Sequence, residues 1–372
     1  MDEEQYLCLE EVLDRALRRE LEGYLDQGTC SFCGGGASGV VSFEFFMEEV
    51  MSAVHSRFQR ASDAGVPRED GDWAEATWDF HEVLQDTLWD AVERAVADAA
   101  EEYDDGDAWV YRDYPWPAVD VSMRQGWREF CAMVHAHGDA VLLPQGVRKS
   151  GYLREVLDDI CEMAKRLGLI VPLLEGSMLW RSRIADAPVN CTASEMGPAP
   201  AHCAAPNRMS PVGVSMFYAA EDAGTAVREV TAHRSDPTAQ SHLTTCAFSV
   251  ARHDCWILDL TDLPDVPSIF DRQQRNLYSF ADFMQHFTAE ITKPIPLDGT
   301  QHREYRPTQV FTQYLRHHAP LAVNGIRFRS AQDSGGVNYV LFAGPEDCTD
   351  VQSQEPEHLL LIEPATVTHA RV

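Results

Sequence analysis

The chain has 372 residues, which is enough for two domains that each bury a core of their own. Hydrophobic residues make up 45% and charged residues 24%, as in ordinary globular proteins. The net charge of −29 argues against general nucleic-acid binding, because phosphate contacts need a basic face. No apolar run is long enough to span a membrane, and the acidic N-terminus lacks the features of a secretory signal. We therefore expect a cytoplasmic protein.

Helical periodicity dominates the acidic first half of the chain. Residues 1–172 hold 36 acidic and 15 basic side chains. Apolar residues recur with the spacing of one helix face over 5–25, 40–60, 73–102, 127–137 and 151–167. The pattern predicts an all-helical domain over 40–172, preceded by a first helix and a glycine-rich knuckle within 1–39.

Short strands replace these helices after residue 172. Runs rich in β-branched and aromatic residues predict strands near 178–183, 215–220, 245–250, 255–260, 326–330, 337–342 and 358–363. Helical patterns at 221–231, 278–290 and 307–318 lie between them. The order predicts a mixed α/β domain over 173–372, so that the fold class of the chain is α+β.

Residues 207–230 carry the pattern that says most about chemistry. Arg208, Tyr218 and Glu229 lie 10 and then 11 residues apart in one predicted strand-and-helix unit. Arginine binds a pyrophosphate through two parallel hydrogen bonds, and an aromatic ring stacks on a flat heterocycle. A carboxylate stabilises the positive charge that a ribose develops when its N-glycosidic bond breaks. These side chains are what is needed to hold a dinucleotide and cleave that bond.

Five segments, taken in chain order, resemble the RES domain, which is named for its Arg, Glu and Ser. They are MLWRSR at 178–183, NRMSPVGVSMFYAAEDAGTAVREV at 207–230, EYRPTQVFTQYLR at 304–316, GIRFRSA at 325–331 and GGVNYVLF at 335–342. Members of this family are bacterial toxins and relatives that consume NAD on an ADP-ribosyltransferase-like fold. The first half of the chain resembles the helical HEPN-type domain that precedes some RES domains.

The resemblance implies which residues surround NAD. Arg208 matches the arginine of the family's Arg-x-x-Pro-x-Gly motif, Tyr218 matches a strand tyrosine, and Glu229 matches the glutamate of the helix that follows. Arg181 matches the arginine of the opening strand. Arg181 and Arg208 are then expected to clamp the diphosphate, Tyr218 to stack on nicotinamide, and Glu229 to stabilise the ribosyl cation.

Two late positions complete the implied NAD site. Ser330 matches the serine after a late strand and is expected to hold the ribose or the nicotinamide amide, and Asn338 matches the asparagine of the next strand. Met209 replaces a tryptophan common in the family, and we expect this change to alter packing around the substrate. Of Arg181 and Arg183 we expect one to face inward and the other to face solvent.

A cysteine pattern near the N-terminus suggests a structural zinc site. Cys30 and Cys33, followed by a glycine, form half of a zinc-ribbon pattern. Cys8 is a candidate third ligand and Glu11 a weaker fourth, in a region where the related N-terminal domain often has a second cysteine pair. A metal-free turn is the alternative. The other cysteines lie singly among apolar neighbours, which predicts reduced thiols.

An RNase function is disfavoured, although the first domain is HEPN-like. HEPN domains that cut RNA carry an arginine and, a few residues later, a histidine on one helix. Arg128 and His135 fit this spacing loosely, but the acidic surface repels RNA. The helical domain is better interpreted as a regulatory or partner-binding module.

The sequence leaves three functions open. The first is an NAD glycohydrolase or phosphorylase that cleaves the nicotinamide–ribose bond, acting as a bacterial toxin or defence effector. The second is a protein ADP-ribosyltransferase with the same site. The third is a non-catalytic RES protein that binds a nucleotide or a partner. The resemblance also implies an Xre-type antitoxin as partner, and pairing of the chain into a homodimer.

Overall fold

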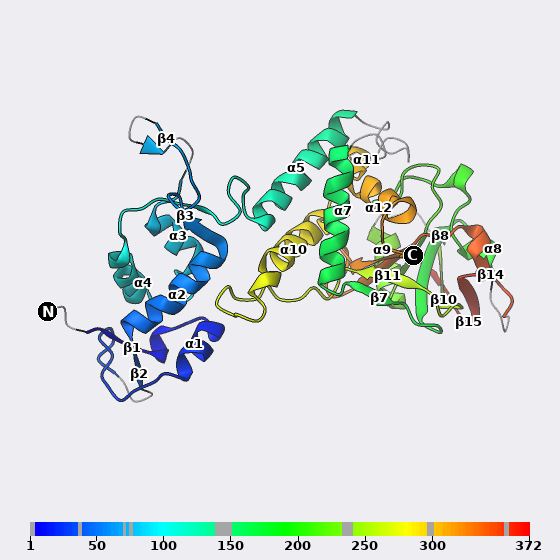
Figure 1. Cartoon of the computed structure of the whole chain (residues 1–372). Helices are drawn as coiled ribbons and strands as arrows, with labels where there is room; N and C mark the ends of the chain where they lie inside the picture. The colour runs from blue at the N-terminus through cyan, green and yellow to red at the C-terminus, as the bar shows by residue number, and fades with distance from the viewer. Residues whose placement is uncertain are drawn as a thin grey trace. The chain divides into compact units, whose positions relative to one another are not determined.

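The computed structural model describes residues 4–35, 39–69, 72–73, 77–137, 151–232, 241–295, 301–352 and 357–372 (Figure 1). The chain divides into two compact units. The first comprises Met1–Ser122 and Asp265–Asp282, and the second comprises Met123–Pro264 and Phe283–Val372. The domain boundaries expected near residues 39 and 172 stay predictions.

The first unit consists mainly of helices with short strand pairs between them. The helices are α1 (Arg15–Glu22), α2 (Phe43–Arg57), α3 (Phe80–Thr87) and α4 (Arg94–Ala100). The two-stranded ladders are β1 (Tyr6–Cys8) with β2 (Val40–Ser42), β3 (Phe58–Arg60) with β6 (Trp109–Tyr111), and β4 (Arg68–Glu69) with β5 (Asp72–Trp73). An all-helical domain is therefore not confirmed. β1, β2 and β3 form at the ends of helical patterns, where periodicity alone does not distinguish a strand from a helix. β4 and β6 form in the segments between those patterns.

The long helix predicted over 73–102 is wrong, because the segment forms two helices, α3 and α4, with a turn between them. The carbonyl of Ala91 in this turn accepts hydrogen bonds from the N–H groups of Leu13 (2.7 Å) and Asp14 (2.9 Å). These tertiary bonds draw the main chain away from the i→i−4 pattern of a helix. Side-chain periodicity does not reveal such bonds, so the two helices looked continuous.

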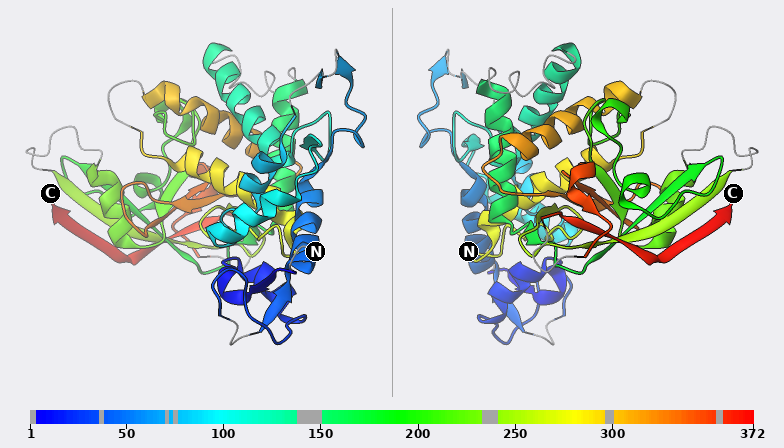
Figure 2. Two further views of the ribbon diagram at one scale, coloured as in Figure 1. Left: turned by 90° about the vertical axis from the view of Figure 1, so that its left-hand side faces the viewer. Right: turned by 90° about the vertical axis from the view of Figure 1, so that its right-hand side faces the viewer.

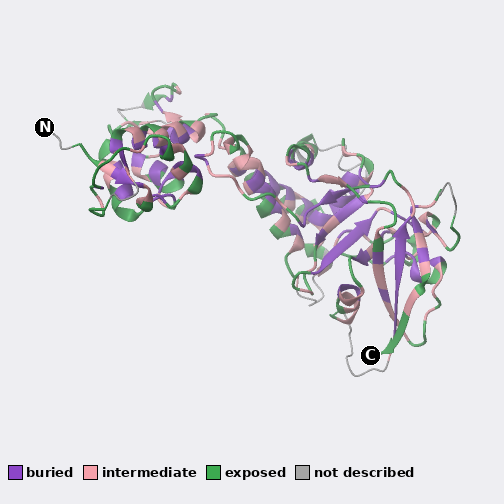
Figure 3. Cartoon of the chain, turned by 90° about the horizontal axis from the view of Figure 1, so that it is seen from below, coloured by how far each residue is buried: buried purple, intermediate pink, exposed green. Residues whose placement is uncertain are grey.

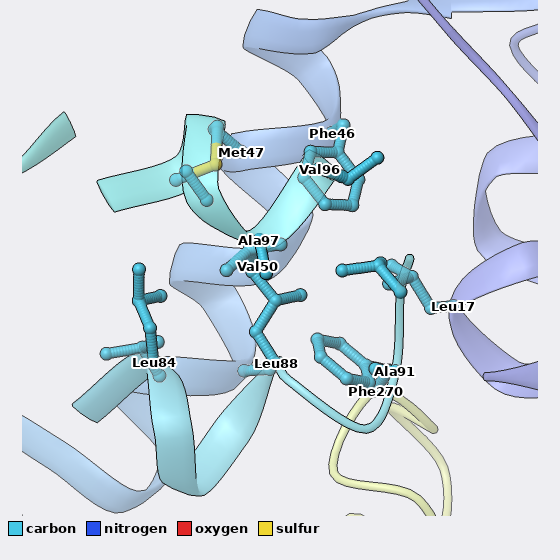
Figure 4. Packing of buried hydrophobic residues seen from close by; sticks show 14 of the residues in the cluster. Leu17, Phe46, Met47, Val50, Leu84, Leu88, Ala91, Val96, Ala97 and Phe270 are labelled. Atoms are coloured by element: carbon cyan, nitrogen blue, oxygen red, sulfur yellow. The ribbon is translucent and has the colours of Figure 1, made fainter. Parts of the chain in front are cut away.

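One apolar core holds the first unit together (Figure 4). Leu17, Val50, Leu84 and Val96 come from four different helices and are fully buried in it. Phe270 packs into the same core from segment 265–282. The chain therefore returns to the first unit after a long excursion through the second.

A large mixed sheet forms the centre of the second unit (Figure 2). Within the described ranges its strand order is β14-β15-β10-β8-β9-β13-β12-β11-β7, with β11–β12 and β14–β15 parallel and the other pairs antiparallel. The strands are β7 (Ile170–Pro172), β8 (Met178–Ala185), β9 (Phe217–Ala220), β10 (His242–Val250), β11 (Trp256–Asp259), β12 (Gly325–Arg329), β13 (Val337–Leu341), β14 (Cys348–Thr349) and β15 (Leu360–Arg371). The predicted strands and the mixed α/β character of this half are confirmed. β7 and β14 were missed because they are too short to show a pattern.

The central strands are buried, as the purple ribbons in Figure 3 show. β10 is buried from Leu243 to Val250, because strands flank it on both edges and apolar side chains cover it. This explains its near-continuous run of small and apolar residues, which lacks the alternation of a half-exposed strand.

Several helices pack together beside this sheet. Their bounds are α5 (Val119–His137), α7 (Gly151–Arg166), α9 (Ala223–Ala232), α10 (Tyr278–Thr292) and α12 (Arg306–His317), with the short α8 (Ala193–Met196) and α11 (Gln301–Glu304). Phe287 of α10 lies edge-on to both Trp127 of α5 (4.9 Å between ring centroids) and Phe311 of α12 (5.1 Å). The hydroxyl of Tyr314 on α12 donates to Asp158 of α7.

Within the described residues, none of the helices has both the length and the apolar character that crossing a bilayer requires.

Candidate functional site

The two central strands of the sheet, β8 and β9, separate soon after they meet. They share one pair of register partners, Trp180 and Ala220, whereas β8 pairs with β10 along its whole length. Where the next main-chain bond would form, Nη1 of Arg181 donates to the main-chain oxygen of Tyr218 at 2.5 Å. A cavity of about 530 Å³ lies at this split, which is the size of ordinary ligand sites.

The cavity wall combines the strands β8, β9 and β13, the helices α9 and α11, and the loops between these elements. Most of the residues predicted for the NAD site lie on it. The residues that line it are Trp180, Arg181, Ser182, Pro206, Asn207, Arg208, Tyr218, Ala219, Ala220, Ala226, Glu229, Val230, Ile295, Gln301, Tyr305, Ala331, Gln332 and Asn338. Segments far apart in the sequence therefore supply one concave surface with both charges and aromatic rings.

Arg181 brings a positive charge to this cavity. Within the described ranges no carboxylate pairs with it, and its Nε is buried without a hydrogen-bond acceptor. Burial lowers the pKa of Arg181, and the neighbouring charge of Arg183 lowers it further. A buried cation without a counter-ion is costly, so an anion in the cavity would be bound strongly.

Arg183 lies on the same face of the sheet as Arg181, since residues two apart along a strand project to the same side. It is half-buried, its Nε also lacks an acceptor, and its Nη2 donates to the main-chain oxygen of Gly197. The expectation that one of the two arginines faces solvent is therefore wrong. Arg183 lines an adjoining cavity together with Ser194 and Glu195.

Arg208 lies in a tight turn that α12 supports. Asn207 and Ser210 close the turn through main-chain hydrogen bonds of 2.8 and 3.3 Å. Nε2 of Gln309 donates to the main-chain oxygens of Asn207 (2.7 Å) and Ser210 (3.1 Å) from below. Because α12 is buried on nearly every side, it is a rigid support for this turn.

The guanidinium of Arg208 is partly engaged by the protein itself. Its Nη1 and Nη2 donate to the main-chain oxygens of Ile291 (3.0 Å) and Lys293 (2.8 Å) at the C-terminal end of α10. It also lies over the ring of Tyr305, 5.4 Å from the centroid. Burial lowers the pKa of Arg208, and the nearby charge of Glu229 opposes this shift. Arg208 thus anchors a helix end as well as lining the cavity.

Met209 points away from the cavity and into the core. It is fully buried, and its sulfur lies 3.6 Å from Oγ1 of Thr312 on α12. It is absent from the residues that line the cavity. The expectation that this replacement changes the substrate's surroundings is therefore not supported, because the side chain contributes to the support of the turn.

Aromatic rings face the cavity from three different elements. Tyr218 on β9 hydrogen-bonds through its hydroxyl to Oγ of Ser210 (2.9 Å), and burial raises its pKa, so the phenol stays neutral. Trp180 on β8 and Tyr305 before α12 also line the cavity. Both residues belong to motif segments of the sequence, but no pattern there marks them as site residues, because only the fold brings them to the cavity beside Tyr218.

Glu229 on α9 presents an oriented carboxylate to the cavity. Its Oε1 accepts hydrogen bonds from Oγ of Ser330 (2.5 Å) and Nδ2 of Asn338 (2.6 Å). Its Oε2 has no hydrogen-bond partner in the part of the chain that the structure describes. One oxygen is therefore used to fix the carboxylate, and the other is available to a ligand.

Ser330 supports Glu229 and does not line the cavity. Its hydroxyl proton is donated to Glu229, and its oxygen accepts the N–H groups of Gln332 (3.1 Å) and Asp333 (3.0 Å). The serine thus closes the turn after β12 and fixes the glutamate in one arrangement. Its predicted contact with ribose or amide stays a prediction.

The same turn is fastened to α9 at a second point. Oδ2 of Asp333 accepts hydrogen bonds from Arg228 (2.6 Å) and from the hydroxyl of Thr225 (2.5 Å). The main-chain N–H of Thr225 also donates to Oδ1 of Asp222 (2.9 Å) at the start of the helix. Because α9 is held at both places, Glu229 has little freedom to move away from Asn338.

The residues predicted to bind metal lie together in the first unit. Cys8, Glu11, Cys30 and Cys33 each offer a ligand atom, and these four atoms lie within 4.8 Å of one another. On α5, Arg128 is exposed and His135 half-buried.

Comparison with known families identifies domains in both halves of the chain. The RES domain family matches residues 178–362, and HEPN/RES N-terminal domain 1 matches residues 25–138. No curated protein and no solved structure gives a match. RES domains are generally associated with enzymatic activity on NAD and with toxin-like functions. The chain therefore belongs to the RES-domain proteins and carries a HEPN/RES-type N-terminal domain.

Proposed function

We propose that this protein cleaves the nicotinamide–ribose bond of NAD, with water or phosphate as the acceptor. The observation that carries the proposal is Glu229. Its carboxylate is fixed through one oxygen, its other oxygen has no partner among the described residues, and it shares its cavity with Arg181, for which the described residues supply no counter-ion. A rigid carboxylate stabilises a developing cation without reorganising during the reaction.

The diphosphate of NAD is the anion that suits Arg181. Two phosphates close to the guanidinium would supply the counter-charge that the described protein residues do not. Arg208 contributes mainly through its charge, because two of its nitrogen atoms already bind main-chain oxygens. This division makes Arg181 the main phosphate ligand and Arg208 the residue that also maintains the cavity wall.

The nicotinamide ring is expected to lie among the aromatic residues. Tyr218, Trp180 and Tyr305 border the same cavity as Glu229. A positively charged pyridinium favours stacking against such rings. The preference weakens once the bond breaks and nicotinamide becomes neutral, which aids release of the product.

The chemical step needs no covalent enzyme intermediate. The bond between C1′ and the pyridinium nitrogen breaks, and its electron pair leaves with nicotinamide. The positive charge that remains on the ribose is stabilised by Glu229, whose free Oε2 also accepts a hydrogen bond from a ribose hydroxyl. Water or phosphate then supplies an electron pair to C1′, and water releases one proton.

Ser330 and Asn338 act in this proposal as positioning residues for Glu229. Both donate to Oε1, at 2.5 and 2.6 Å. Two donors to one oxygen fix the orientation of the carboxylate and leave Oε2 for the ligand. Such support is what a residue acting through its charge requires.

Loss of NAD from the cell would make the protein a toxin or defence effector, which agrees with the general association of RES domains. An Xre-type antitoxin is the partner that this role implies. The acidic N-terminal half is then a candidate for the surface that receives regulation.

Purified protein incubated with NAD tests the proposal. We expect release of nicotinamide, measured by chromatography, that depends on Glu229. ADP-ribose as co-product identifies water as acceptor, and ADP-ribose 1″-phosphate formed only with added phosphate identifies a phosphorylase. Label from NAD retained on protein would instead indicate a transferase. Tight NAD binding without release of nicotinamide under any of these conditions would contradict a catalytic function.

A further inference from the structure

We propose that Cys8, Glu11, Cys30 and Cys33 form a structural zinc site in the first unit. These residues come from two segments that the fold brings together, and their ligand atoms all lie within 4.8 Å of one another. Three thiolates and one carboxylate are ligands that Zn²⁺ accepts in tetrahedral geometry. The proposal is independent of the NAD site, which lies in the second unit.

The sulfur spacing fits a bound zinc ion better than a disulfide. Sγ of Cys8 and Sγ of Cys33 lie 3.6 Å apart. Tetrahedral zinc with Zn–S bonds of about 2.3 Å places two sulfurs about 3.8 Å apart, whereas a disulfide requires about 2.0 Å. The observed distance therefore leaves space for an ion between the sulfurs.

Local structure holds the two segments in place. Cys8 ends β1, which pairs with β2 through Cys8 and Val40. Tyr6 on β1 joins the Cys30–Cys33 turn twice, since its N–H donates to Oγ of Ser31 (2.9 Å) and its carbonyl accepts the N–H of Ser31 (2.8 Å). These hydrogen bonds therefore fix the position of Cys8 relative to Cys30 and Cys33.

Main-chain N–H groups point at two of the sulfurs. The N–H of Cys8 donates to Sγ of Cys30, and the N–H of Gly35 donates to Sγ of Cys33, each at 3.4 Å. Gly34 adopts a φ of +72°, which lets the chain turn back after Cys33. In metal sites, hydrogen bonds from groups that do not bind the metal orient the ligands and partly offset their negative charge, and these N–H groups can do the same for thiolates.

Glu11 is a better fourth ligand than its neighbour Glu10. Glu11 is half-buried and belongs to the cluster of four, whereas Glu10 is exposed. Oε2 of Glu10 lies 3.7 Å from Sγ of Cys8, so it contacts the edge of the cluster. The two residues form a natural experimental pair, because they are adjacent and carry the same charge.

A site of this kind has a structural role. Four protein ligands would fill the tetrahedral positions of zinc and leave none for a substrate. The ion would tie the N-terminal residues 8–11 to the turn at 30–33. The family match begins at residue 25, so Cys8 and Glu11 extend the site beyond the matched domain.

Metal analysis of the full chain, purified without a histidine tag under reducing conditions, is the first test. We expect about one zinc ion per chain. Replacement of zinc by Co²⁺ should give the absorption bands of a tetrahedral cobalt–thiolate centre. Absence of both zinc and the cobalt spectrum after anaerobic reconstitution, or a disulfide between Cys8 and Cys33 in the protein purified under these conditions, would overturn the proposal.

Variants identify the ligands. Cys33→Ser should lose the metal, whereas Cys203→Ser, which changes another exposed cysteine, should keep it. Glu11→Gln should weaken zinc binding by roughly tenfold or more, since the loss of a residue that only supports a ligand already has an effect of that size. Glu10→Gln should not weaken it. Glu11→Cys should tighten binding, which keeps the test informative if Cys33→Ser fails to fold. Equal zinc affinity in all variants would refute the assignment.

Discussion

Asn338 fixes the orientation of Glu229, because its Nδ2 donates a hydrogen bond to Oε1 at 2.6 Å. Asn338 lies on β13 opposite Ala220 of β9, so this single bond ties the glutamate of α9 to the centre of the sheet. Oε1 is also bound by Ser330, whereas Oε2 has no hydrogen-bond partner among the described residues.

Glu229→Gln should lower kcat for nicotinamide release by roughly 10²–10³-fold, the usual effect of losing one electrostatic contact to a transition state. Glutamine retains an oxygen that can accept the bonds from Ser330 and Asn338, so the fold and the thermal midpoint should stay close to the parent. Glu221→Gln is the matched control, because Glu221 pairs with Arg327 and does not line the cavity. An unchanged kcat in Glu229→Gln would exclude the role given to its charge.

Asn338→Asp should make both activity and stability depend on pH. The substitution places a second carboxylate within hydrogen-bonding distance of the carboxylate of Glu229. Two such groups raise the pKa of one member of the pair. A raised folded-state pKa contributes stability that is present below the unfolded value of about 4 and is lost as the pH rises through the folded value. The variant should therefore lose more stability, relative to the parent, at pH 8 than at pH 5.5.

Urea denaturation and kcat at these two pH values measure the effect of Asn338→Asp. Asn338→Ser is the control, since it removes the amide donor without adding a charge. Its difference from the parent should not change between pH 5.5 and pH 8. If both variants behaved alike across this range, Asn338 and Glu229 would not be coupled as the geometry indicates.

Ser330→Ala should lower kcat by less than Glu229→Gln and leave the affinity for NAD nearly unchanged. The hydroxyl of Ser330 is occupied by Glu229, Gln332 and Asp333, so its loss loosens the glutamate and removes no ligand contact. Calorimetric titration of NAD together with steady-state kinetics separates the two effects. A large loss of affinity with an unchanged kcat would instead favour the direct contact that the family resemblance implies.

The strands and the order of the site residues could be predicted from the sequence, because strand patterns and family motifs are local. The split between β8 and β9 could not, since it depends on one side chain, Arg181, taking the place of a main-chain bond to Tyr218. The burial of Met209 could not be predicted from the sequence either. A motif shows which residues are neighbours in sequence and gives no information about which of them face the core.

The helical half shows the same limit for a different reason. Apolar spacing over 73–102 predicts one helix. The carbonyl of Ala91, however, accepts hydrogen bonds from the N–H groups of Leu13 and Asp14, which lie far away in the sequence. Periodicity measures which face of a segment is buried. It does not reveal where the main chain makes its hydrogen bonds, so helix breaks of this kind need the tertiary structure.

Buried thiols should make the second unit less stable above pH 9. Burial raises the pKa of Cys161, Cys246 and Cys348 to about 12, whereas an unfolded thiol ionises near 8.5. Because the folded value is raised, the stability they contribute is complete below about pH 8.5 and is lost progressively as the pH rises towards 12. The urea midpoint should therefore be lower at pH 10 than at pH 8.

Cys161→Ala should reduce the fall in the urea midpoint between pH 8 and pH 10, although the cavity left by the substitution lowers stability at both pH values. Cys203→Ala should leave the fall unchanged, since Cys203 is exposed. The comparison therefore depends on the difference between the two pH values and not on either midpoint alone. A fall of equal size in the parent and in Cys161→Ala would show that other groups cause it.

Arg181→Met should separate stability from function. The buried guanidinium has no counter-ion in the described chain and leaves its Nε without an acceptor, so an apolar side chain of similar length removes a desolvation cost. The thermal midpoint should stay the same or rise, even though the bond to Tyr218 is lost. KM for NAD should rise by roughly 10–100-fold, because hydrogen bonds to charged groups contribute about 1.5–3 kcal/mol.

Pyrophosphate provides the deciding measurement for Arg181. It should raise the thermal midpoint of the parent and have little effect on Arg181→Met, since ligands that bind only the folded state stabilise it according to their affinity. Arg183→Met is the matched control, because Arg183 lies on the same strand face but lines the adjoining cavity. If Arg181→Met lost several degrees of thermal stability and kept the pyrophosphate response, the arginine would be a structural residue and the diphosphate would bind elsewhere.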